Sequence, residues 1–310
     1  MRDRFSHTCK HWREINSPLP EWIVELLWGV ANHLDELTKT LEIAIQGNRM
    51  VQGFPEFVAI LGPSDESEDA EKHAGRLSDA EITARAAFAK NEAEKGHPIL
   101  HGNALVAIWS AVDTCIEDIA VGLLLNDPAI LKNEVFSKIR IPLAEFEILD
   151  KEERARFLLG EVERQKASRR HGVARFESFL EPFGLSGAVA DDVKQHVYAC
   201  NHMRNVIVHR RSVVDRKLVE NCPWLNLKIG ERLVVTTYEY QKYHHYLWKY
   251  LETVIKRLRR YFLKKTVALA EDASPPARLV ESEQPAKLKD NCLVDDVRDE
   301  VRNTSSSENT

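Results

Sequence analysis

Residues 193–209, VKQHVYACNHMRNVIVH, decide the fold class expected for this chain. An α-helix turns by about 100° per residue, and on that spacing a set of apolar side chains falls within one arc. The members of this arc are Val193, Val197, Cys200, Met203, Ile207 and Val208. We expect the arc to face the interior or a partner, within a helix over residues 188–211.

The same periodicity recurs along most of the chain, so the sequence predicts an all-α helical bundle. Ser78 and Glu81 form a capping-box pattern, which marks the start of one of the helices. The expected helices span residues 19–45, 78–96, 103–126, 151–168, 173–180, 188–211 and 239–264. Residues 226–237 carry β-branched side chains around Gly230 and predict a small β-hairpin before the last helix.

Four regions follow from this pattern. Residues 1–62 are expected to be an N-terminal helical region, and residues 63–100 an acidic linker with a surface helix. Residues 101–265 form the main helical domain. Residues 266–310 contain few large apolar side chains, so they are expected to be a disordered tail.

The formal net charge of −5 conceals a division along the chain. Residues 161–265 hold 21 Lys and Arg against 11 Asp and Glu, whereas the rest of the chain holds 22 against 37. A basic module of this kind suits an anionic partner such as RNA. The alternative is that these charges only solvate the outer faces of helices.

The compartment is expected to be the cytoplasm. The most apolar long stretch, residues 104–125, carries Asp113, Glu117 and Asp118 near its middle, where a bilayer would make each charge costly. The first residues show no secretion signal, so neither export nor membrane insertion is predicted. The five cysteines are scattered without a C-x-x-C pair, which favours reduced thiols: Cys9, Cys115, Cys200, Cys222 and Cys292. His7, Cys9 and His11 make a poor metal site near the chain terminus, and neither a metal nor a cofactor is expected.

The residues that carry chemistry lie on the 188–211 helix. Arg204 falls near the centre of the apolar arc, and a guanidinium placed there needs a carboxylate, a phosphate or a solvated interface opposite. His202, Asn205 and His209 are spaced three and four apart and stack beside it. Imidazoles can move the protons in RNA transesterification, while an arginine stabilises charge on the phosphate oxygens.

Two features limit this site. Arg204 and His209 are five residues apart, about 140° around an ideal helix, so they converge only if the arginine swings round or the helix ends near His209. One imidazole cannot easily serve both sides of an in-line reaction. A homodimer that pairs this helix with its twin would supply two.

Other charged residues are supporting candidates. Asp113 and Glu117 are four apart on the 103–126 helix, and they could pair with Arg204 or His209 or make surface ion pairs instead. Four basic residues near the end of the last helix could hold RNA phosphates or form a solvated basic face. They are Lys256, Arg257, Arg259 and Arg260.

Residues 201–215, NHMRNVIVHRRSVVD, resemble the R-N-x-x-x-H signature with a downstream aspartate found in HEPN domains. Residues 173–185 and 223–237 also look like the flanking segments of some members, so the resemblance covers roughly residues 101–265. The sequence departs from the family at Arg211, where many members have glycine.

The resemblance implies a helical bundle that dimerises along the motif helix and cleaves RNA without metal, as toxins and antiviral defence effectors do. Arg204 and His209 would be catalytic, Asn205 supporting, and an antitoxin or regulator protein would be a partner. The rival expectation is a catalytically silent HEPN module that binds RNA, a nucleotide or a protein.

Overall fold

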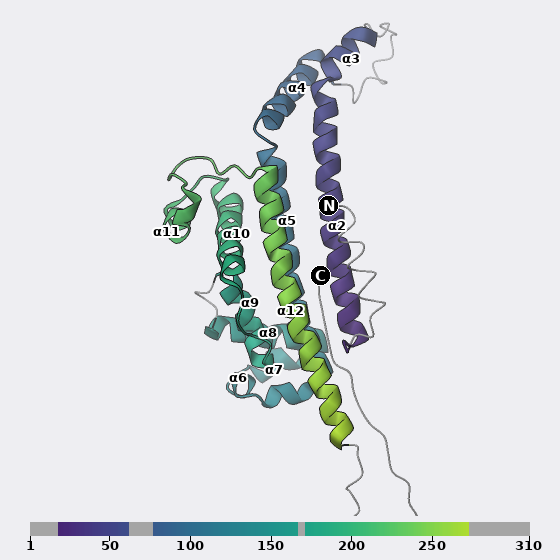
Figure 1. The fold of residues 1–310 in the computed structure, drawn as a ribbon, viewed down its shortest axis with the longest axis vertical. Coiled ribbons are helices and arrows are strands. Elements are labelled where there is room, and N and C mark those ends of the chain that lie inside the picture. The colour runs from purple at the N-terminus through teal and green to yellow at the C-terminus, as the bar shows by residue number, and fades with distance from the viewer. Residues whose placement is uncertain (1–17, 62–76, 167–170, 273–310) are drawn as a thin grey trace, which may run out of the picture.

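Four long helices lie side by side in this protein (Figure 1). The computed structural model describes residues 18–61, 77–166 and 171–272. The long helices are α2 (Glu21–Gln52), α5 (Pro98–Asn126), α10 (Asp191–Arg210) and α12 (Thr237–Asp272). The shorter helices are α3 (Phe54–Leu61), α4 (Asp79–Glu94), α6 (Glu134–Ser137), α7 (Leu143–Glu147), α8 (Lys151–Lys166), α9 (Val173–Leu180) and α11 (Arg216–Asn221). The all-α expectation is therefore confirmed.

Helix α5 is the centre of the bundle. It packs against α2, α8, α9, α10 and α12. Its start is set by His97, whose backbone is left-handed (φ 57°), and by Pro98 in the first turn. It ends at Asn126, two residues before Pro128, as the sequence predicts.

Helix α2 shares the hydrophobic core of α5. Trp22 lies so close to Gly122 that a Cβ at that position would overlap the indole ring. Ile23 and Leu27 are buried in the same core as the apolar residues of α5. The sequence predicted a boundary between the linker region and the main helical domain at residues 100–101, and these residues lie within the first turn of α5.

An arm projects beyond the N-terminal end of α5. We define it as the distal half of α2 together with α3 and α4, which lie at the top of Figure 1. The capping box of α4 is confirmed, because Ser78 Oγ accepts from Glu81 N at 3.3 Å and Ser78 N donates to Glu81 Oε2 at 2.8 Å. Asn48 Nδ2 donates to the Ala89 carbonyl at 3.0 Å and ties α4 to α2.

The predicted hairpin over residues 226–237 is wrong. Within the described ranges there is one isolated antiparallel bridge, Val213 with Arg232, and no strand. The segment pairs with the chain that leaves α10, since Leu233 N donates to the Ser212 carbonyl at 2.7 Å and Val214 N to the Glu231 carbonyl at 2.9 Å. Residues 231–233 therefore pair with residues 212–214 and not with another part of the predicted hairpin.

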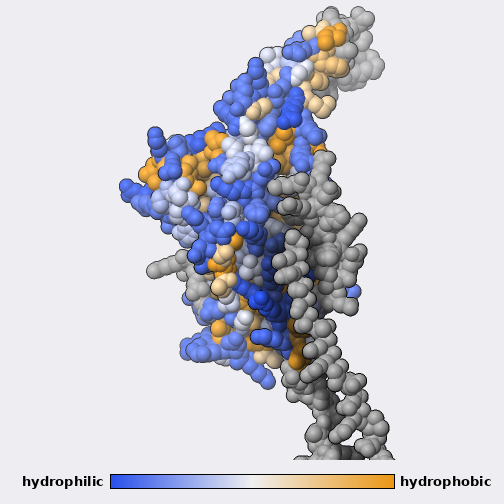
Figure 2. All heavy atoms as spheres, viewed as in Figure 1, coloured by the Kyte–Doolittle hydropathy of each residue, from blue (hydrophilic) through white to orange (hydrophobic). Residues whose placement is uncertain are grey.

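The tail prediction is wrong over its first residues. Helix α12 continues to Asp272, so residues 266–272 are helical, and residues 273–310 lie outside the described ranges. None of the helices in residues 18–61, 77–166 and 171–272 is both long and apolar enough to cross a membrane. The surface in Figure 2 is mostly hydrophilic, with apolar areas over α3 and around α11.

Candidate functional site

Arg204 lies at the edge of the core, on the face of α10 that meets α5. Val197 and Cys200, one to two turns earlier, are fully buried, whereas Arg204 is half-buried. The Arg204 Nη1 donates to Asn205 Oδ1 at 3.1 Å, which draws the guanidinium toward the side of α10 that carries Asn205. The Arg204 Nε is buried and has no hydrogen-bond partner in the described part of the chain. Arg204 therefore keeps one unsatisfied donor inside the protein.

His209 is exposed in the last turn of α10. The helix ends at Arg210, and Arg211 and Ser212 both adopt left-handed backbone conformations, with φ 53° and 62°. Ser212 N donates to the Val206 carbonyl at 3.2 Å, which closes the end of the helix. The chain thus turns away directly after His209 and leaves the imidazole accessible.

The downstream aspartate has a structural role. Asp215 Oδ1 accepts from Leu218 N at 2.9 Å and caps α11, while Asp215 Oδ2 lies 3.7 Å from Arg210 Nε. These contacts hold the turn after His209. Among the described residues, no hydrogen bond joins Arg204 to His209 within one chain.

Asp113 of α5 is a carboxylate whose pKa is influenced by the charge of Arg204. Arg175 from α9 donates to it directly, and Arg175 Nε also donates to Glu163 Oε1 at 3.1 Å. Burial raises the pKa of Asp113, while the charges of Arg175 and Arg204 act in the opposite direction. Arg204 is therefore close enough to influence Asp113, although Arg175 is its direct partner.

Glu117 contacts neither Arg204 nor His209. Its Oε1 accepts from Arg156 Nη1 of α8 at 3.2 Å, and the same guanidinium binds Asp118 Oδ1 at 2.8 Å. Of the two alternatives expected for Glu117, the structure therefore has the surface ion pair and not a contact with α10. The reason is that α8 packs along α5 and brings a competing arginine to it.

His202 lies inside the protein and is only 6% exposed. Its ring centroid is 4.6 Å from that of Tyr198 and 5.1 Å from that of His171. Burial, and then the nearby His171, lower the pKa of His202. His202 is thus a buried ring and does not share the solvent-exposed position of His209.

His171 is a neighbour of α10 that sequence periodicity did not identify. It precedes Gly172, whose backbone (φ 58°) approaches α10 so closely that a Cβ would lie 2.8 Å from Tyr198 Cα. Asn201 Nδ2 lies 3.5 Å from His171 Nδ1. The sequence signal for this contact was Gly172 directly after His171, but that signal did not show which helix the chain would approach.

The four basic residues of α12 separate into two groups. Lys256 and Arg260 are exposed, and Arg259 is half-buried with an unpartnered Nε. The assignment of Arg257 to phosphate binding needs correction, because its Nη1 donates to Glu177 Oε1 at 2.8 Å and its Nη2 to the Ala188 carbonyl at 3.0 Å. Arg257 is an internal ion-pair partner, and Lys256 and Arg260 remain the candidates for RNA contact.

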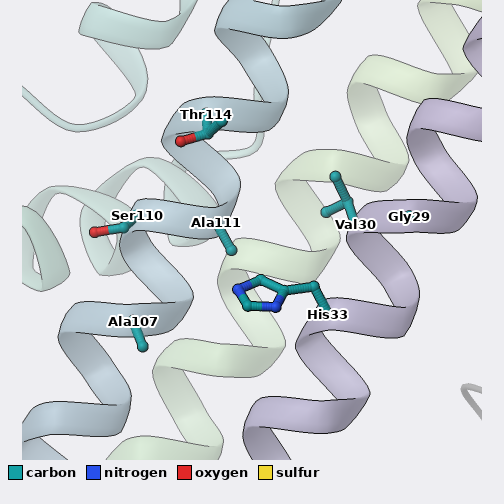
Figure 3. A pocket seen from close by; sticks show the side chains of 7 residues that line it. All are labelled: Gly29, Val30, His33, Ala107, Ser110, Ala111 and Thr114. Carbon is teal, nitrogen blue, oxygen red and sulfur yellow. The ribbon is translucent and has the colours of Figure 1, made fainter.

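A shallow hollow of about 430 Å³ lies between α2 and α5, away from Arg204. Figure 3 shows the His33 ring pointing from α2 toward α5 across it, while the Ser110 and Thr114 hydroxyls point aside. Small side chains form most of its wall, which is lined by Gly29, Val30, His33, Ala107, Ser110, Ala111 and Thr114. It offers few polar groups to orient a ligand.

Metal and thiol chemistry find little support in the described residues. No three His, Cys, Asp or Glu side chains of residues 18–61, 77–166 and 171–272 are placed to share a metal ion. His7, Cys9 and His11 lie outside those ranges. Cys115 and Cys222 are buried, and burial raises the pKa of each thiol to about 12.

The comparisons with protein-family models, curated proteins and solved structures gave no match. The residues of α10 and their surroundings therefore carry the function proposed for the chain.

Proposed function

We propose that this protein is a metal-independent endoribonuclease of the HEPN type. The observation that carries the proposal is that Arg204, Asn205 and His209 share the last two turns of α10, where Arg204 is half-buried and His209 is exposed. Arg204 Nη1 is fixed by Asn205 at 3.1 Å, its Nε is unpartnered, and His209 is exposed. An arginine oriented by a neighbouring amide and an accessible imidazole on the same helix are the kinds of group that a phosphodiester substrate needs.

The end of α10 also supports the resemblance. Arg211 occupies a left-handed backbone position (φ 53°), which is the conformation that glycine adopts most readily. Many HEPN domains have glycine there, so the departure at Arg211 changes the side chain and keeps the local geometry. His209 is therefore presented as a glycine-terminated helix would present it.

In the proposed reaction, an imidazole accepts the proton of the ribose 2′-hydroxyl as its oxygen attacks the phosphorus. The bond from phosphorus to the departing 5′-oxygen breaks, and a second imidazole donates a proton to that oxygen. The products are a 2′,3′-cyclic phosphate and a 5′-hydroxyl. Arg204 stabilises the charge on the nonbridging oxygens.

The second imidazole is proposed to come from His209 of a second copy. His202 does not serve, because it is buried and its pKa is lowered. Arg211 is exposed two residues after His209, and Arg216 and Lys217 are exposed on α11, which packs against α10, so all three add positive charge to this part of the molecule. An RNA-cleaving toxin or defence effector would also need a regulator protein, such as an antitoxin.

The test is incubation of the purified protein with RNA in EDTA. Wild type should produce 2′,3′-cyclic phosphate ends, and Arg204→Ala and His209→Ala should each lower the rate by at least about 100-fold. His196→Ala is the matched control, because His196 lies on the same helix but stacks on Tyr246 with ring centroids 3.8 Å apart. An equal loss in the control would mean that α10 has been disturbed and would remove the support from Arg204 and His209.

The second candidate is a silent module that binds RNA, a nucleotide or a protein. The lack of a direct bond between Arg204 and His209 within one chain favours it. Salt-dependent RNA binding by wild type without cleavage, weakened by Lys256→Ala and Arg260→Ala, would select this alternative.

A further inference from the structure

The arm joins the bundle through a short joint between α4 and α5, which Figure 1 shows at the N-terminal end of α5. We define this joint as residues 92–101. Gly96 and His97 both have left-handed backbones, with φ 76° and 57°. A left-handed backbone costs free energy at any residue other than glycine, so contacts around His97 must stabilise it there.

Hydrogen bonds close the joint around His97. His97 N donates to the Glu92 carbonyl at 2.7 Å, and Ile99 N, in the first turn of α5, donates to Glu92 Oε2 at 3.2 Å. The His97 carbonyl accepts from the backbone N and from the ring Nδ1 of His101, each at 3.0 Å. Glu92, His97 and His101 are 7%, 7% and 1% exposed, so the joint is a buried polar cluster with little access to water.

The side-chain amide of Asn48, on α2, decides which form of the His97 ring fits the joint. Asn48 Nδ2 donates to the Ala89 carbonyl of α4 at 3.0 Å, and a carbonyl can only accept, so this bond fixes the orientation of the amide. The same Nδ2 lies 3.2 Å from His97 Nδ1, and an amide nitrogen can only donate. His97 Nδ1 must therefore accept, so the ring is neutral and carries its proton on Nε2.

Charged and titratable groups from three helices act on the His97 ring. They are Arg49 of α2, Glu92 of α4 and His101 of α5. Burial is the largest cause that lowers the pKa of His97, and His101 and Arg49 lower it further, while Glu92 acts in the opposite direction. The surroundings therefore favour the same neutral ring that the hydrogen bonds require.

Helix α12 reaches the joint through Tyr240. Its ring centroid lies 5.8 Å from that of His101 and 5.9 Å from that of His244. Burial raises the pKa of Tyr240 and lowers that of His244, so α12 brings no charge to the joint from these two rings near neutral pH. Glu42 of α2 also acts on the pKa of Tyr240.

We propose that the joint is a pH-sensitive switch that holds α4 to α2 and α5 while His97 is neutral and lets α4 open locally once His97 takes up a proton. A proton on Nδ1 would set an N–H against the amide N–H of Asn48 at a separation of 3.2 Å, so this bond would be lost. The cation would also be poorly hydrated, because His97 is 7% exposed in the closed joint. Both penalties disappear when α4 moves away and water reaches the ring.

The direction of the pH dependence follows from the closed and open states of the joint. In the open joint His97 has its ordinary pKa of 6.5, and in the closed joint that pKa is lower. The closed joint is therefore fully favoured above pH 6.5. Below pH 6.5 the equilibrium constant for opening should rise by up to about tenfold per pH unit.

The test is amide hydrogen exchange of the full chain, followed by mass spectrometry at pH 7.5, 6.5 and 5.5. Each measured rate is divided by the intrinsic rate of an unfolded peptide at the same pH, which gives the protection. The protection of α4 should fall by up to about tenfold per pH unit below pH 6.5, relative to α8 at the other end of the bundle (Figure 1). His244→Gln is carried in every chain, because burial of His244 adds a pH dependence of its own.

Three variants make the test specific to His97. His97→Asn should remove the dependence on pH, and asparagine tolerates a left-handed backbone. His33→Gln is the matched control and should keep the full dependence, because His33 is an α2 histidine whose side chain is 56% exposed. Asn48→Asp places an acceptor opposite His97 Nδ1 and favours the protonated ring, so α4 should gain protection as the pH falls.

Nitrogen-15 spectra of the histidine rings give an independent readout that needs no variant of the joint. At pH 7.5 His97 should carry its proton on Nε2, whereas His101 should carry one on Nδ1, which donates to a carbonyl. A proton on His97 Nδ1 at that pH would contradict the switch.

Three exchange results would also overturn it. They are an α4 protection that stays constant relative to α8 in wild type, an equal fall in His97→Asn, and a fall in Asn48→Asp that matches wild type. RNA cleavage enters neither readout, so a failed switch would leave the proposed endoribonuclease intact.

Discussion

The pair formed by Arg257 and Glu177 should be among the most costly to break. The two side chains are only 14% and 16% exposed, and Arg257 Nη1 donates to both carboxylate oxygens, at 2.8 and 3.0 Å. The same guanidinium also donates to the carbonyls of Leu185 and Ala188. It therefore joins α12 to α9 and to the loop before α10.

Arg257→Ala should lower the free energy of unfolding by about 3 kcal/mol. Removal of one partner from a buried ion pair costs about 3–5 kcal/mol, because the other charge stays buried. The lower end applies here, since Glu177 keeps the Tyr250 hydroxyl at 2.8 Å and Gly187 N at 2.7 Å. Urea unfolding followed by far-ultraviolet circular dichroism measures this change.

Two further variants serve as controls for Arg257→Ala. Lys256→Ala, on the preceding and exposed residue, should change the stability by less than about 0.5 kcal/mol. Glu177→Gln in the Arg257→Ala chain should recover part of the loss, because it removes the unpaired charge. A loss below about 1 kcal/mol in Arg257→Ala, or weaker RNA binding without a loss of stability, would refute the reasoning.

Three further predictions concern single positions. Gly172→Ala should lower the free energy of unfolding by about 2 kcal/mol or more, because the residue has φ 58° and a Cβ would lie 2.8 Å from Tyr198 Cα; urea unfolding that matches wild type would contradict this. Arg211→Gly should raise the thermal midpoint, with a gain of about 0.5 kcal/mol or more, since it relieves a left-handed backbone at φ 53°. Burial lowers the pKa of His244 from 6.5 to about 4, so its unfolded form binds more protons between those values. The contribution of the neutral His244 to stability should be complete above pH 6.5 and should fall by up to about 1.4 kcal/mol per pH unit toward pH 4. Urea midpoints measured at pH 7, 6 and 5 should therefore decrease in wild type and should depend less on pH in His244→Gln.

The longer helices could be predicted from the sequence because most of them carry a periodic apolar face, and α4 could be predicted from its capping box. The short helices α3, α6, α7 and α11 were not predicted. Helix α9 spans Val173–Leu180, as expected, and α10 was placed within three residues at its start. The ends of α2 and α12 were placed too early, because both helices continue beyond the apolar stripe that was used to place them. Helix boundaries depend on local capping more than on periodicity.

The segment after α10 could not be predicted in the same way. Residues 226–237 have the β-branched composition of a strand, but Leu233 and Val214 find backbone partners across the turn that follows α10. That pairing depends on where α10 ends in space. Composition alone does not contain this information.

The candidate site shows the same difference between contacts within one helix and contacts between helices. The sequence placed Arg204 in an apolar arc and required a carboxylate, a phosphate or a solvated interface opposite it. In the structure its hydrogen bond is to the Asn205 amide of the same helix, and Asp113 experiences only its charge. The sequence did not predict that Arg175 would take Asp113, or that Glu177 would take Arg257, because those residues lie on other helices. Contacts between helices follow from packing, which the spacing within one helix does not determine.

The central position of α5 also bears on how the molecule opens. Because α2, α8, α9, α10 and α12 all pack on it, its backbone amides become accessible to solvent only when most of the bundle separates. Deuterium should therefore enter α5 at the rate of global unfolding. The amides of α3, which rest on two neighbours alone, should exchange orders of magnitude faster through local opening.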